Sequence, residues 1–541
     1  MSRKDFILPI VLSLTWIIIF LFIDPLHDFP LNDDWSYALS VKQFVEEGDL
    51  YLTDWNASPI LTLILWGSLF CIPFGFSFGA LTISTLVSGI AGVLFTYSLL
   101  KIVSGKRMVA LLAALLIAVN PLYISLSVTF MMDVHFYALF VMSIFFYVRF
   151  FKEKSNSWLI PAFLASLFAM FLRQFAIVVP LTFLALEIIS QKKVFKRVVL
   201  LNLSVVLVVL AAYFIFNKWL EAKGMLPANF RSITDLMDVG ITEMGWRVFV
   251  RTGFMLIEAG LWLFPLIVLI FIKSIASFRK RMLWPAVVGI IFLIPMVRVV
   301  GDFPAGNILY DLGLGPVTTR DVFILGLSKD LFSVQWVIIL FRALGLAGGI
   351  MLVVLVMNKF IHLAGAIRSN RRSYDEFYAL SGVIALILYA GIAMINFTYF
   401  DRYILPMLPL FMLILIPGNK GGLTIGYPLK AIFTLFLTGL LVFGVLSTRH
   451  YLQWNRMRLE LIRTLEMEGI PAEKVDGGHE YNGWSGKEIN REGKWDISGQ
   501  EYVISFTEMR GFRVFKKHRG TNPLTGREYS VYVLKREDLT R

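Results

Sequence analysis

The sequence has few charged residues and only one cysteine for its length. Of its 541 residues, 16% are Asp, Glu, Lys or Arg, whereas 57% are hydrophobic, and the mean hydropathy is +0.71. A water-soluble fold cannot bury that much apolar surface, so the composition excludes a soluble globular protein and predicts a chain that crosses a membrane many times. The single cysteine, Cys71, cannot form a disulfide within the chain and gives no indication of the redox compartment.

The apolar segments have the lengths of membrane helices. They run for about 15–24 residues, which favours α-helices over the shorter alternating strands of a barrel. The first segment is followed by Asp24-Pro25-Leu26-His27, which contains no small-residue cleavage site. We therefore expect this first helix to stay in the protein and not to be cleaved off as a signal peptide. We expect about thirteen spans, near 6–23, 78–100, 108–128, 136–150, two short helices within 158–189, 198–216, 252–272, 283–300, 334–357, 377–395, 403–416 and 429–447.

The net charge of +13 does not require a nucleic-acid partner, because membrane proteins keep loops rich in Lys and Arg on the cytoplasmic side. The segment 59–73 is short for a span, and we expect it to stay on the outer side as a re-entrant or juxtamembrane segment. With this assignment and the spans above, nearly every strongly basic loop lies on the cytoplasmic side. This arrangement predicts a multi-pass protein of the plasma (inner) membrane with a cytoplasmic N-terminus and an outer C-terminus.

The composition becomes polar after residue 447. Apolar residues at helical spacing predict a helix over 451–468, and alternation predicts strands over 501–506, 512–515 and 529–534. We therefore predict an all-α polytopic membrane domain of residues 1–447, with an outer loop of residues 24–58. A small extracytoplasmic α+β domain of residues 448–541 follows.

Two adjacent acids, Asp33 and Asp34, lie in the outer loop just before an amphipathic stretch that predicts a short surface helix over 35–47. One interpretation is a solvated turn or an N-cap for that helix. The other is a general base that activates an acceptor group for attack on a glycosyl phosphate. The sequence pattern alone does not decide between them.

A second acidic position, Asp133 with His135, is expected at a very short outer turn between two spans. Turn capping is one explanation and a substrate contact is the other. A His beside an Asp is also compatible with a divalent metal ion as a cofactor. The sequence shows only these few candidate ligands, so we assign no residue to a metal site.

Arg173 interrupts a long apolar block, where a charge is costly and usually faces a cavity or a partner. A planar cation at an outer turn suits a lipid phosphate. Arg402 is a second candidate, for which a local ion pair with Asp401 is the simpler alternative. Arg298 and Arg320 are weaker candidates of the same kind.

Over roughly residues 1–420, these features together resemble the GT-C membrane glycosyltransferases, and within them the protein O-mannosyltransferase and lipid A aminoarabinose transferase group. Asn32-Asp33-Asp34-Trp35-Ser36-Tyr37-Ala38 is similar to that group's Asp-Glu-x-x-Tyr signature, with Asp34 in place of Glu. The other segments that carry the resemblance are Gly48-Asp49-Leu50-Tyr51, Asp54-Trp55, Met132-Asp133, Leu172-Arg173 and Asp401-Arg402-Tyr403-Ile404-Leu405-Pro406. The tail segment 476–484 is similar to tails of bacterial relatives.

The resemblance implies a GT-C-like fold and an inverting transfer of sugar on the outer face of the membrane. The donor would be a polyprenyl-phosphate sugar, and the acceptor a lipid, glycan or protein. By analogy, Asp33 would be the base, Asp34 and Asp133 would orient donor or acceptor, and Arg173 would hold the lipid phosphate. Tyr37, His135 and Arg402 would complete the substrate site. Ser58-Pro59 stands where many relatives carry Lys-Pro or Pro-Pro, so the acceptor class cannot be inherited.

A transporter or flippase of a lipid-linked sugar is the main alternative, with the same charged residues lining its path. The sequence shows no internal repeat, which is unusual for a transporter, and its candidate charges gather at one face. A polymerase or ligase that handles glycans on a lipid pyrophosphate is a third possibility.

Overall fold

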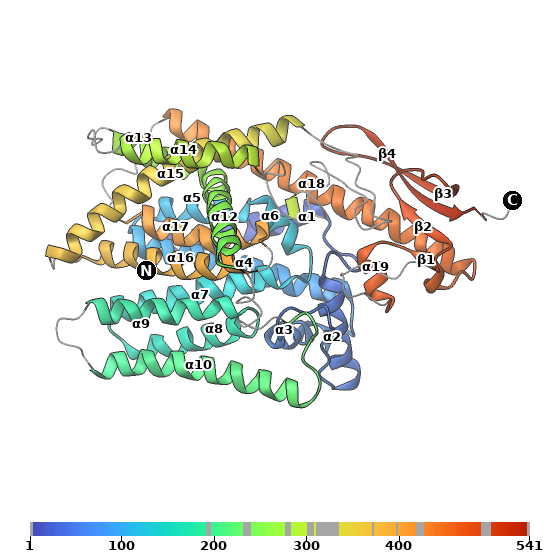
Figure 1. Ribbon diagram of the computed structural model, residues 1–541, viewed down its shortest axis with the longest axis horizontal. Coiled ribbons are helices and arrows are strands. Elements are labelled where there is room, and N and C mark those ends of the chain that lie inside the picture. The colour runs from blue at the N-terminus through green and yellow to red at the C-terminus, as the bar shows by residue number, and fades with distance from the viewer. Residues whose placement is uncertain are drawn as a thin grey trace.

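The protein is mostly helical, with one small sheet near its C-terminal end (Figure 1). The computed structural model describes residues 4–190, 196–230, 240–275, 283–299, 308–309, 335–369, 373–396, 399–417, 427–487 and 499–537. The α-helices are α1 (Lys4–Ile23), α2 (Asp34–Glu47), α3 (Leu61–Cys71), α4 (Phe78–Ser104), α5 (Arg107–Ala118), α6 (Pro121–Ser127), α7 (Met132–Glu153), α8 (Leu159–Met170), α9 (Val178–Ser190), α10 (Lys196–Ala222), α12 (Ile241–Trp262), α13 (Phe264–Ile275), α14 (Leu283–Val299), α15 (Gln335–Ser369), α16 (Tyr374–Ile395), α17 (Met407–Leu415), α18 (Tyr427–Met467) and α19 (His479–Trp484). Short 3₁₀ helices are η1 (Asn156–Trp158), η2 (Gln174–Ile177), η5 (Asp401–Ile404) and η6 (Ala472–Lys474).

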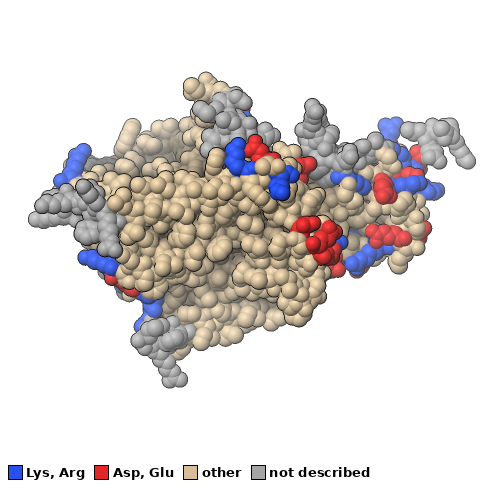
Figure 2. Space-filling model, turned by 90° about the horizontal axis from the view of Figure 1, so that it is seen from below, with Lys and Arg blue, Asp and Glu red and all other residues tan. Residues whose placement is uncertain are grey.

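The helices confirm a multi-pass membrane protein. Within the described residues, 6 helices are long and apolar enough to cross a membrane, or up to 8 if each of two bent pairs is one span. Together with the shorter apolar helices of 10–17 residues, they come close to the thirteen spans that the sequence predicts. Figure 2 shows charged side chains at the left end of the face in view, at the middle of its upper edge and over its right half, with a broad uncharged surface between the left end and the other two groups. That distribution is the one expected when lipid surrounds the middle of the molecule.

Two predicted spans are bent. The span near 108–128 is α5 followed by α6 at 60°, and Asn120 caps α6 by accepting hydrogen bonds from the backbone N–H groups of Leu122 and Tyr123. The predicted span near 252–272 is also a bent pair, because α12 and α13 meet at 87°. Pro265, the second residue of α13, has no N–H to donate and its ring would clash with the preceding turn, so the helix cannot continue in line.

Three further segments bear on the predicted spans. The segment 59–73 contains α3, whose 11 residues reach only about 16 Å, well short of the roughly 30 Å hydrocarbon layer. The block 158–189 divides into α8 and α9 at Arg173, as predicted. The segment 403–416 forms η5 and then α17, a helix of 9 residues that are all buried, so it is an interior helix too short for the span that the sequence predicts.

The polar end of the chain packs around the C-terminal half of α18. The sequence predicts separate helices at 429–447 and 451–468, but α18 is one helix of 41 residues. Ser447-Thr448-Arg449-His450 contains no Gly or Pro that would break it. The sheet has the order β1-β2-β4-β3, with β1 (Val475–Asp476) parallel to β2 (Tyr502–Ser505), and with β4 (Glu528–Arg536) antiparallel to both β2 and β3 (Phe512–Thr521). The three predicted strands are therefore confirmed, whereas β1 and α19 were not expected.

Helices α12 and α15 approach each other through glycines. A Cβ atom added at Gly260 would lie 2.2 Å from the backbone nitrogen of Gly349, and one added at Gly348 would lie 2.2 Å from the carbonyl oxygen of Gly260. Small residues allow this close backbone packing between membrane helices. The crossing therefore depends on the absence of side chains at these positions.

We expect Gly260→Ala to lower the thermal unfolding temperature of the purified protein, because α12 and α15 must move apart to admit the methyl group. Overpacking of this kind costs about 1–3 kcal/mol. Gly365→Ala on α15 is the matched control, since an added Cβ atom there meets nothing within 4 Å. An unfolding temperature of Gly260→Ala equal to that of the control would contradict the close packing.

Candidate active site

The loop before α2 is held in place by Asp34. Its Oδ1 accepts a hydrogen bond from the backbone N–H of Leu31 at 2.6 Å, and its Oδ2 accepts one from the N–H of Phe130 at 3.0 Å. Asn32, which follows Leu31 in this loop, takes a left-handed backbone conformation with φ +57°, which Asn tolerates better than most residues. Burial raises the pKa of Asp34. Asp34 therefore fastens the loop to the segment that precedes α7, and both of its oxygens are occupied.

Asp33, the N-cap residue of α2, faces a different set of partners. Its Oδ1 accepts hydrogen bonds from Trp55 Nε1 at 2.9 Å and from His479 Nε2 at 3.2 Å. Its Oδ2 lies 3.8 Å from Nη2 of Arg402. Burial alone would raise the pKa of Asp33, but the hydrogen bond and charge of His479, the charge of Arg402 and the hydrogen bond from Trp55 together hold that pKa below its usual value. Asp33 is thus kept as a carboxylate.

Arg402 joins Asp33 to the acidic residue of α7. Its Nε lies 3.7 Å from Oδ1 of Asp133, and the same oxygen lies 2.7 Å from Nη2 of Arg173. The side chains of Asp133 and Arg402 are only 3% and 7% exposed, so these charges interact away from bulk water. The result is a row of alternating charges in the order Asp33, Arg402, Asp133 and Arg173, which we call the charged row.

Four separate parts of the fold supply the charged row. Asp33 comes from the start of α2, Asp133 from the first turn of α7, Arg173 from the turn between α8 and η2, and Arg402 from η5. Aromatic rings pack on the two guanidinium groups, with Tyr403 5.0 Å from Arg173 and Phe400 4.5 Å from Arg402. The structure therefore brings Asp33, Asp133, Arg173 and Arg402 into one cluster.

Asp133 and His135 do not lie in a turn, so that prediction is wrong. Helix α7 begins at Met132, and Asp133 sits in its first turn, where a carboxylate interacts favourably with the helix dipole. Oδ2 of Asp133 is buried and has no hydrogen-bond partner among the described residues. Such an atom is a natural place for a substrate hydroxyl or a water molecule to donate.

Two other predicted site residues lie near the charged row with different surroundings. Tyr37 is buried on α2, one turn after Asp33, and burial raises its pKa. His135 places Nδ1 3.1 Å from the carbonyl oxygen of Met131 and borders a mainly apolar cavity of about 480 Å³ between α3, α4, α7 and α8. No hydrogen bond connects His135 to the charged row in the described part of the chain.

Asp401, the partner considered as the simpler alternative for Arg402, is held mainly by backbone N–H groups. Asp401 accepts hydrogen bonds from the N–H groups of Leu309, Ile308 and Arg402 at 2.8, 3.4 and 2.8 Å. Burial raises the pKa of Asp401 to about 6. The guanidinium group of Arg402 lies within 4 Å of carboxylate oxygens of both Asp33 and Asp133. Arg320, and the side chain of Arg298, lie outside what the structure describes.

The C-terminal region contributes residues that sequence reasoning missed. In α19, His479 contacts Asp33, and Glu480 accepts a hydrogen bond from the N–H of Asn32 at 3.3 Å while pairing with Arg458 at 2.8 Å. Helix α19 packs directly on α2, since a Cβ atom added at Gly483 would lie 2.4 Å from the ring of Trp35. The only signal in the sequence was the similarity of the tail segment 476–484 to the tails of relatives.

The arrangement provides the parts of a group-transfer site. A low-pKa carboxylate at Asp33 is available to accept a proton, and two buried guanidinium groups within the same row are available to hold a phosphate. Among the residues that the structure describes, no group of three or more His, Cys, Asp or Glu side chains is arranged to hold a metal ion.

Comparisons with known proteins find two similar solved structures and one family model. No curated protein matches the chain. Among solved structures, the chain is similar to the crystal structure of ArnT from Cupriavidus metallidurans bound to undecaprenyl phosphate, at 12% identity over 98% of each chain with a TM-score of 0.41. It is also similar to the apo state of the same protein, at 12% identity over 97% of each chain with a TM-score of 0.39.

The family comparison covers the part of the chain from α3 through most of α10, including Asp133 and Arg173. Residues 57–216 match the model of the family described as dolichyl-phosphate-mannose-protein mannosyltransferase. The predicted resemblance is confirmed over this stretch, and with the membrane helices it supports a membrane glycosyltransferase with a polyprenyl-phosphate-linked donor. Residues 57–216 are thus similar to the dolichyl-phosphate-mannose-protein mannosyltransferase family.

Proposed function

We propose that this protein transfers a sugar from a polyprenyl-phosphate donor to an acceptor on the outer face of the plasma (inner) membrane, with inversion at the anomeric carbon. The observation that carries the proposal is the charged row, which places a carboxylate with a lowered pKa 3.8 Å from an arginine that also reaches Asp133 and, through it, Arg173. A base and two phosphate-binding cations are then within reach of one sugar phosphate.

The reaction is a single displacement. An acceptor oxygen or nitrogen attacks the anomeric carbon, the bond from that carbon to the phosphate oxygen breaks, and the polyprenyl phosphate leaves with the electron pair. Asp33 accepts the proton that the acceptor loses. Arg173 and Arg402 stabilise the negative charge that grows on the leaving phosphate. Asp34 holds the loop that carries Asp33, and Asp133 sets the position of both arginines.

The proposed orientation of the protein in the membrane rests on the distribution of basic loops along the sequence. We place the N-terminus in the cytoplasm and the domain of residues 448–541 outside, so that the charged row opens toward the outer leaflet. The donor is a polyprenyl-phosphate sugar, and the acceptor is a lipid, glycan or protein that reaches this face. Tyr37 and His135 flank the site, Tyr37 beside the charged row and His135 beside the apolar cavity.

Proteoliposomes test the proposed function against the transporter alternative. The purified full chain is reconstituted with a panel of labelled polyprenyl-phosphate sugars and with a lipid and glycan extract of the cell envelope as the acceptor. We expect label to move from polyprenyl phosphate to an acceptor. Label that crosses the bilayer and stays on its lipid would instead identify a flippase.

His479 is expected to act as a positioning residue for Asp33. Its hydrogen bond and charge lower the pKa of Asp33, so His479→Ala should raise that pKa and move the acid limb of the kcat/KM profile to higher pH. The same substitution removes stabilisation that is present above the unfolded pKa of Asp33 and lost as the pH falls through its folded pKa.

The control for His479→Ala is His518→Ala, which changes a half-exposed histidine on β3 that pairs only with Glu460 at 3.5 Å among the described residues. His479→Gln, which keeps a donor N–H, should restore part of the wild-type profile. A pH profile of His479→Ala that superimposes on the wild-type profile would remove His479 from the site.

A further inference from the structure

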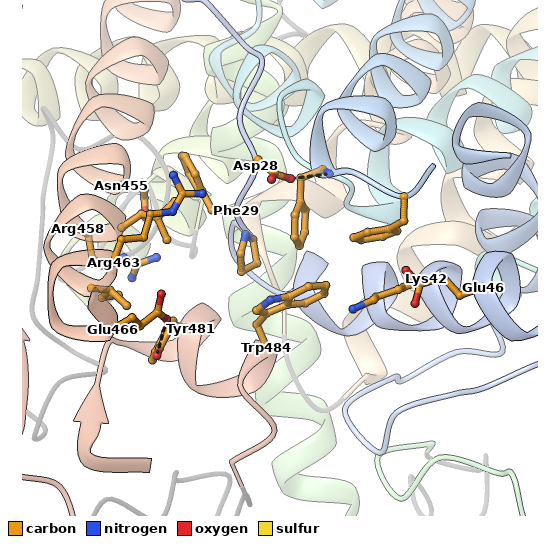
Figure 3. A pocket seen from close by; sticks show the side chains of 15 residues that line it. Asp28, Phe29, Lys42, Glu46, Asn455, Arg458, Arg463, Glu466, Tyr481 and Trp484 are labelled. Carbon is orange, nitrogen blue, oxygen red and sulfur yellow. Dashed lines mark hydrogen bonds between the residues drawn. The ribbon is translucent and has the colours of Figure 1, made fainter. Parts of the chain in front are cut away.

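A cavity of about 450 Å³ lies beside the candidate active site, between the membrane domain and the C-terminal region. One wall comes from the loop before α2 and from α2, and the facing wall from the C-terminal half of α18 and from α19 (Figure 3). Its volume falls within the usual range of ligand pockets, about 300–1,000 Å³. The residues of the charged row do not line this cavity.

Aromatic rings form part of the cavity wall. Trp484 stacks on Phe76 with ring centroids 5.9 Å apart and an interplanar angle of 13°, and Phe78 meets it edge-on at 4.9 Å. These contacts fix the plane of the Trp484 ring, which remains partly exposed. Tyr481, from the previous turn of α19, lines the same space. A rigid aromatic surface of this kind suits a ligand with a flat apolar face.

The charged side chains around the cavity balance one another. Three acids and three bases line it: Asp28, Glu46, Glu466, Lys42, Arg458 and Arg463. Arg458 already pairs with Glu480 at 2.8 Å, and Nζ of Lys42 lies 5.6 Å from the ring centre of Trp484. A strongly anionic ligand would meet as many carboxylates as cations here, so the lining favours a neutral ligand.

Asn455 adds an unsatisfied polar group. It is 1% exposed, its Nδ2 donates to the carbonyl oxygen of Tyr451 at 2.8 Å, and it lines the cavity. Its Oδ1 is buried without a hydrogen-bond partner in the described part of the chain. Leaving such an atom unpaired is costly, and a ligand hydroxyl that donates to it would remove the cost.

We infer that this cavity binds a neutral saccharide unit of the acceptor, so that the acceptor is a glycan; the inference rests on the proposed function. A pyranose ring has an apolar C–H face for the Trp484 ring and hydroxyl groups around its edge that both donate and accept. Carboxylates and Asn455 accept those donors, and Arg463 and Lys42 supply donors.

The cavity is close enough to the charged row to serve the transfer. His479 and Trp484 are five residues apart in α19, which corresponds to about 7–8 Å along a helix. His479 contacts Asp33, and Trp484 lines the cavity. Phe29 and Pro30 also line the cavity, three to four residues before Asp33. A glycan held on Trp484 would therefore extend its next unit toward the carboxylate.

Saturation-transfer difference NMR on the full chain in lipid nanodiscs tests the inference without requiring catalysis. The probes are maltotriose, chitotriose and mannotriose, with glucose 6-phosphate as the anionic comparison. We expect at least one neutral trisaccharide to bind through its C–H protons, and Trp484→Ala to weaken that binding at least tenfold. Trp284→Ala, which removes a 68% exposed tryptophan from α14, is the matched control and should bind as the wild type does.

Arg463→Ala, at an exposed position on the rim, provides a second variant that should weaken binding severalfold even if Trp484→Ala fails to fold. The inference is overturned if no neutral trisaccharide binds the wild type, if both cavity variants bind as tightly as Trp284→Ala, or if only glucose 6-phosphate binds. A wild-type chain that transfers sugar but binds no trisaccharide would overturn the cavity's role alone. A chain that binds trisaccharide but transfers from no donor would overturn the proposed function.

Discussion

Asp33→Asn is expected to abolish sugar transfer while the protein still folds and inserts. The amide is close in shape to the carboxylate and its oxygen can still accept the hydrogen bond from Trp55. It cannot take a proton from the acceptor, and loss of a general base usually lowers the rate by about 10²–10⁴-fold. The measurement is the transfer of labelled sugar from polyprenyl phosphate in proteoliposomes, normalised to the amount of inserted protein.

Asp49→Asn is the matched control for Asp33→Asn, because Asp49 is an exposed acid of the same segment between α1 and α3 and has no contact with the charged row among the described residues. Its transfer rate should stay within a factor of about two of the wild-type rate, as expected for a surface substitution. An Asp33→Asn protein that is well inserted and fully active would show that Asp33 is not the general base. Asp34→Asn should instead act through loop geometry, since both Asp34 oxygens bind backbone N–H groups.

Local patterns in the sequence were sufficient for much of the fold. The helix predicted over 35–47 is α2, and the strands predicted near 501–506, 512–515 and 529–534 are β2, β3 and β4. The break at Arg173 was also predicted, because a charge inside an apolar block is costly unless the chain turns there. Each of these features depends on residues close together in the chain, so periodicity and single-residue chemistry reveal it.

Other features depend on contacts that no local pattern records. The prediction placed Asp33, Asp133 and Arg173 on one side of the membrane, but only tertiary packing brings them within one cluster through Arg402. The contact of His479 with Asp33 joins residues that are 446 positions apart. The length of α18 was missed because a change in composition near residue 447 marks where the environment becomes polar, not where a helix ends.

The different roles of the two adjacent acids could not be predicted from the sequence, because they too depend on tertiary contacts. Asp33 and Asp34 are chemically identical, and the pattern offered both a capping and a catalytic interpretation. Asp34 points into the protein, where the N–H groups of Leu31 and Phe130 surround it, whereas Asp33 meets side chains from α19 and η5. One acid holds the loop and the other faces the partners that a reaction would use.

Arg402→Gln is expected to remove transfer activity and also to destabilise the protein. Arg402 is the one described cation that lies within 4 Å of both Asp33 and Asp133, at 3.8 and 3.7 Å. Removing it leaves two nearby carboxylates in a poorly hydrated site, and breaking a buried ion pair in this way costs about 3–5 kcal/mol. We expect a lower thermal unfolding temperature together with a transfer rate at least about 10²-fold below that of the wild type.

Arg402→Lys separates charge from geometry. A lysine keeps the positive charge, but its single ammonium group cannot present two nitrogens to two carboxylates as the planar guanidinium does through Nε and Nη2. It should therefore recover part of the stability and little of the activity. Arg456→Lys is the control, because Arg456 forms an exposed pair with Asp24 at 2.9 Å, and such surface pairs contribute only about 0–1 kcal/mol. If Arg402→Lys transfers sugar as fast as Arg456→Lys, the reaction does not depend on the planar guanidinium, and a positive charge at this position is sufficient.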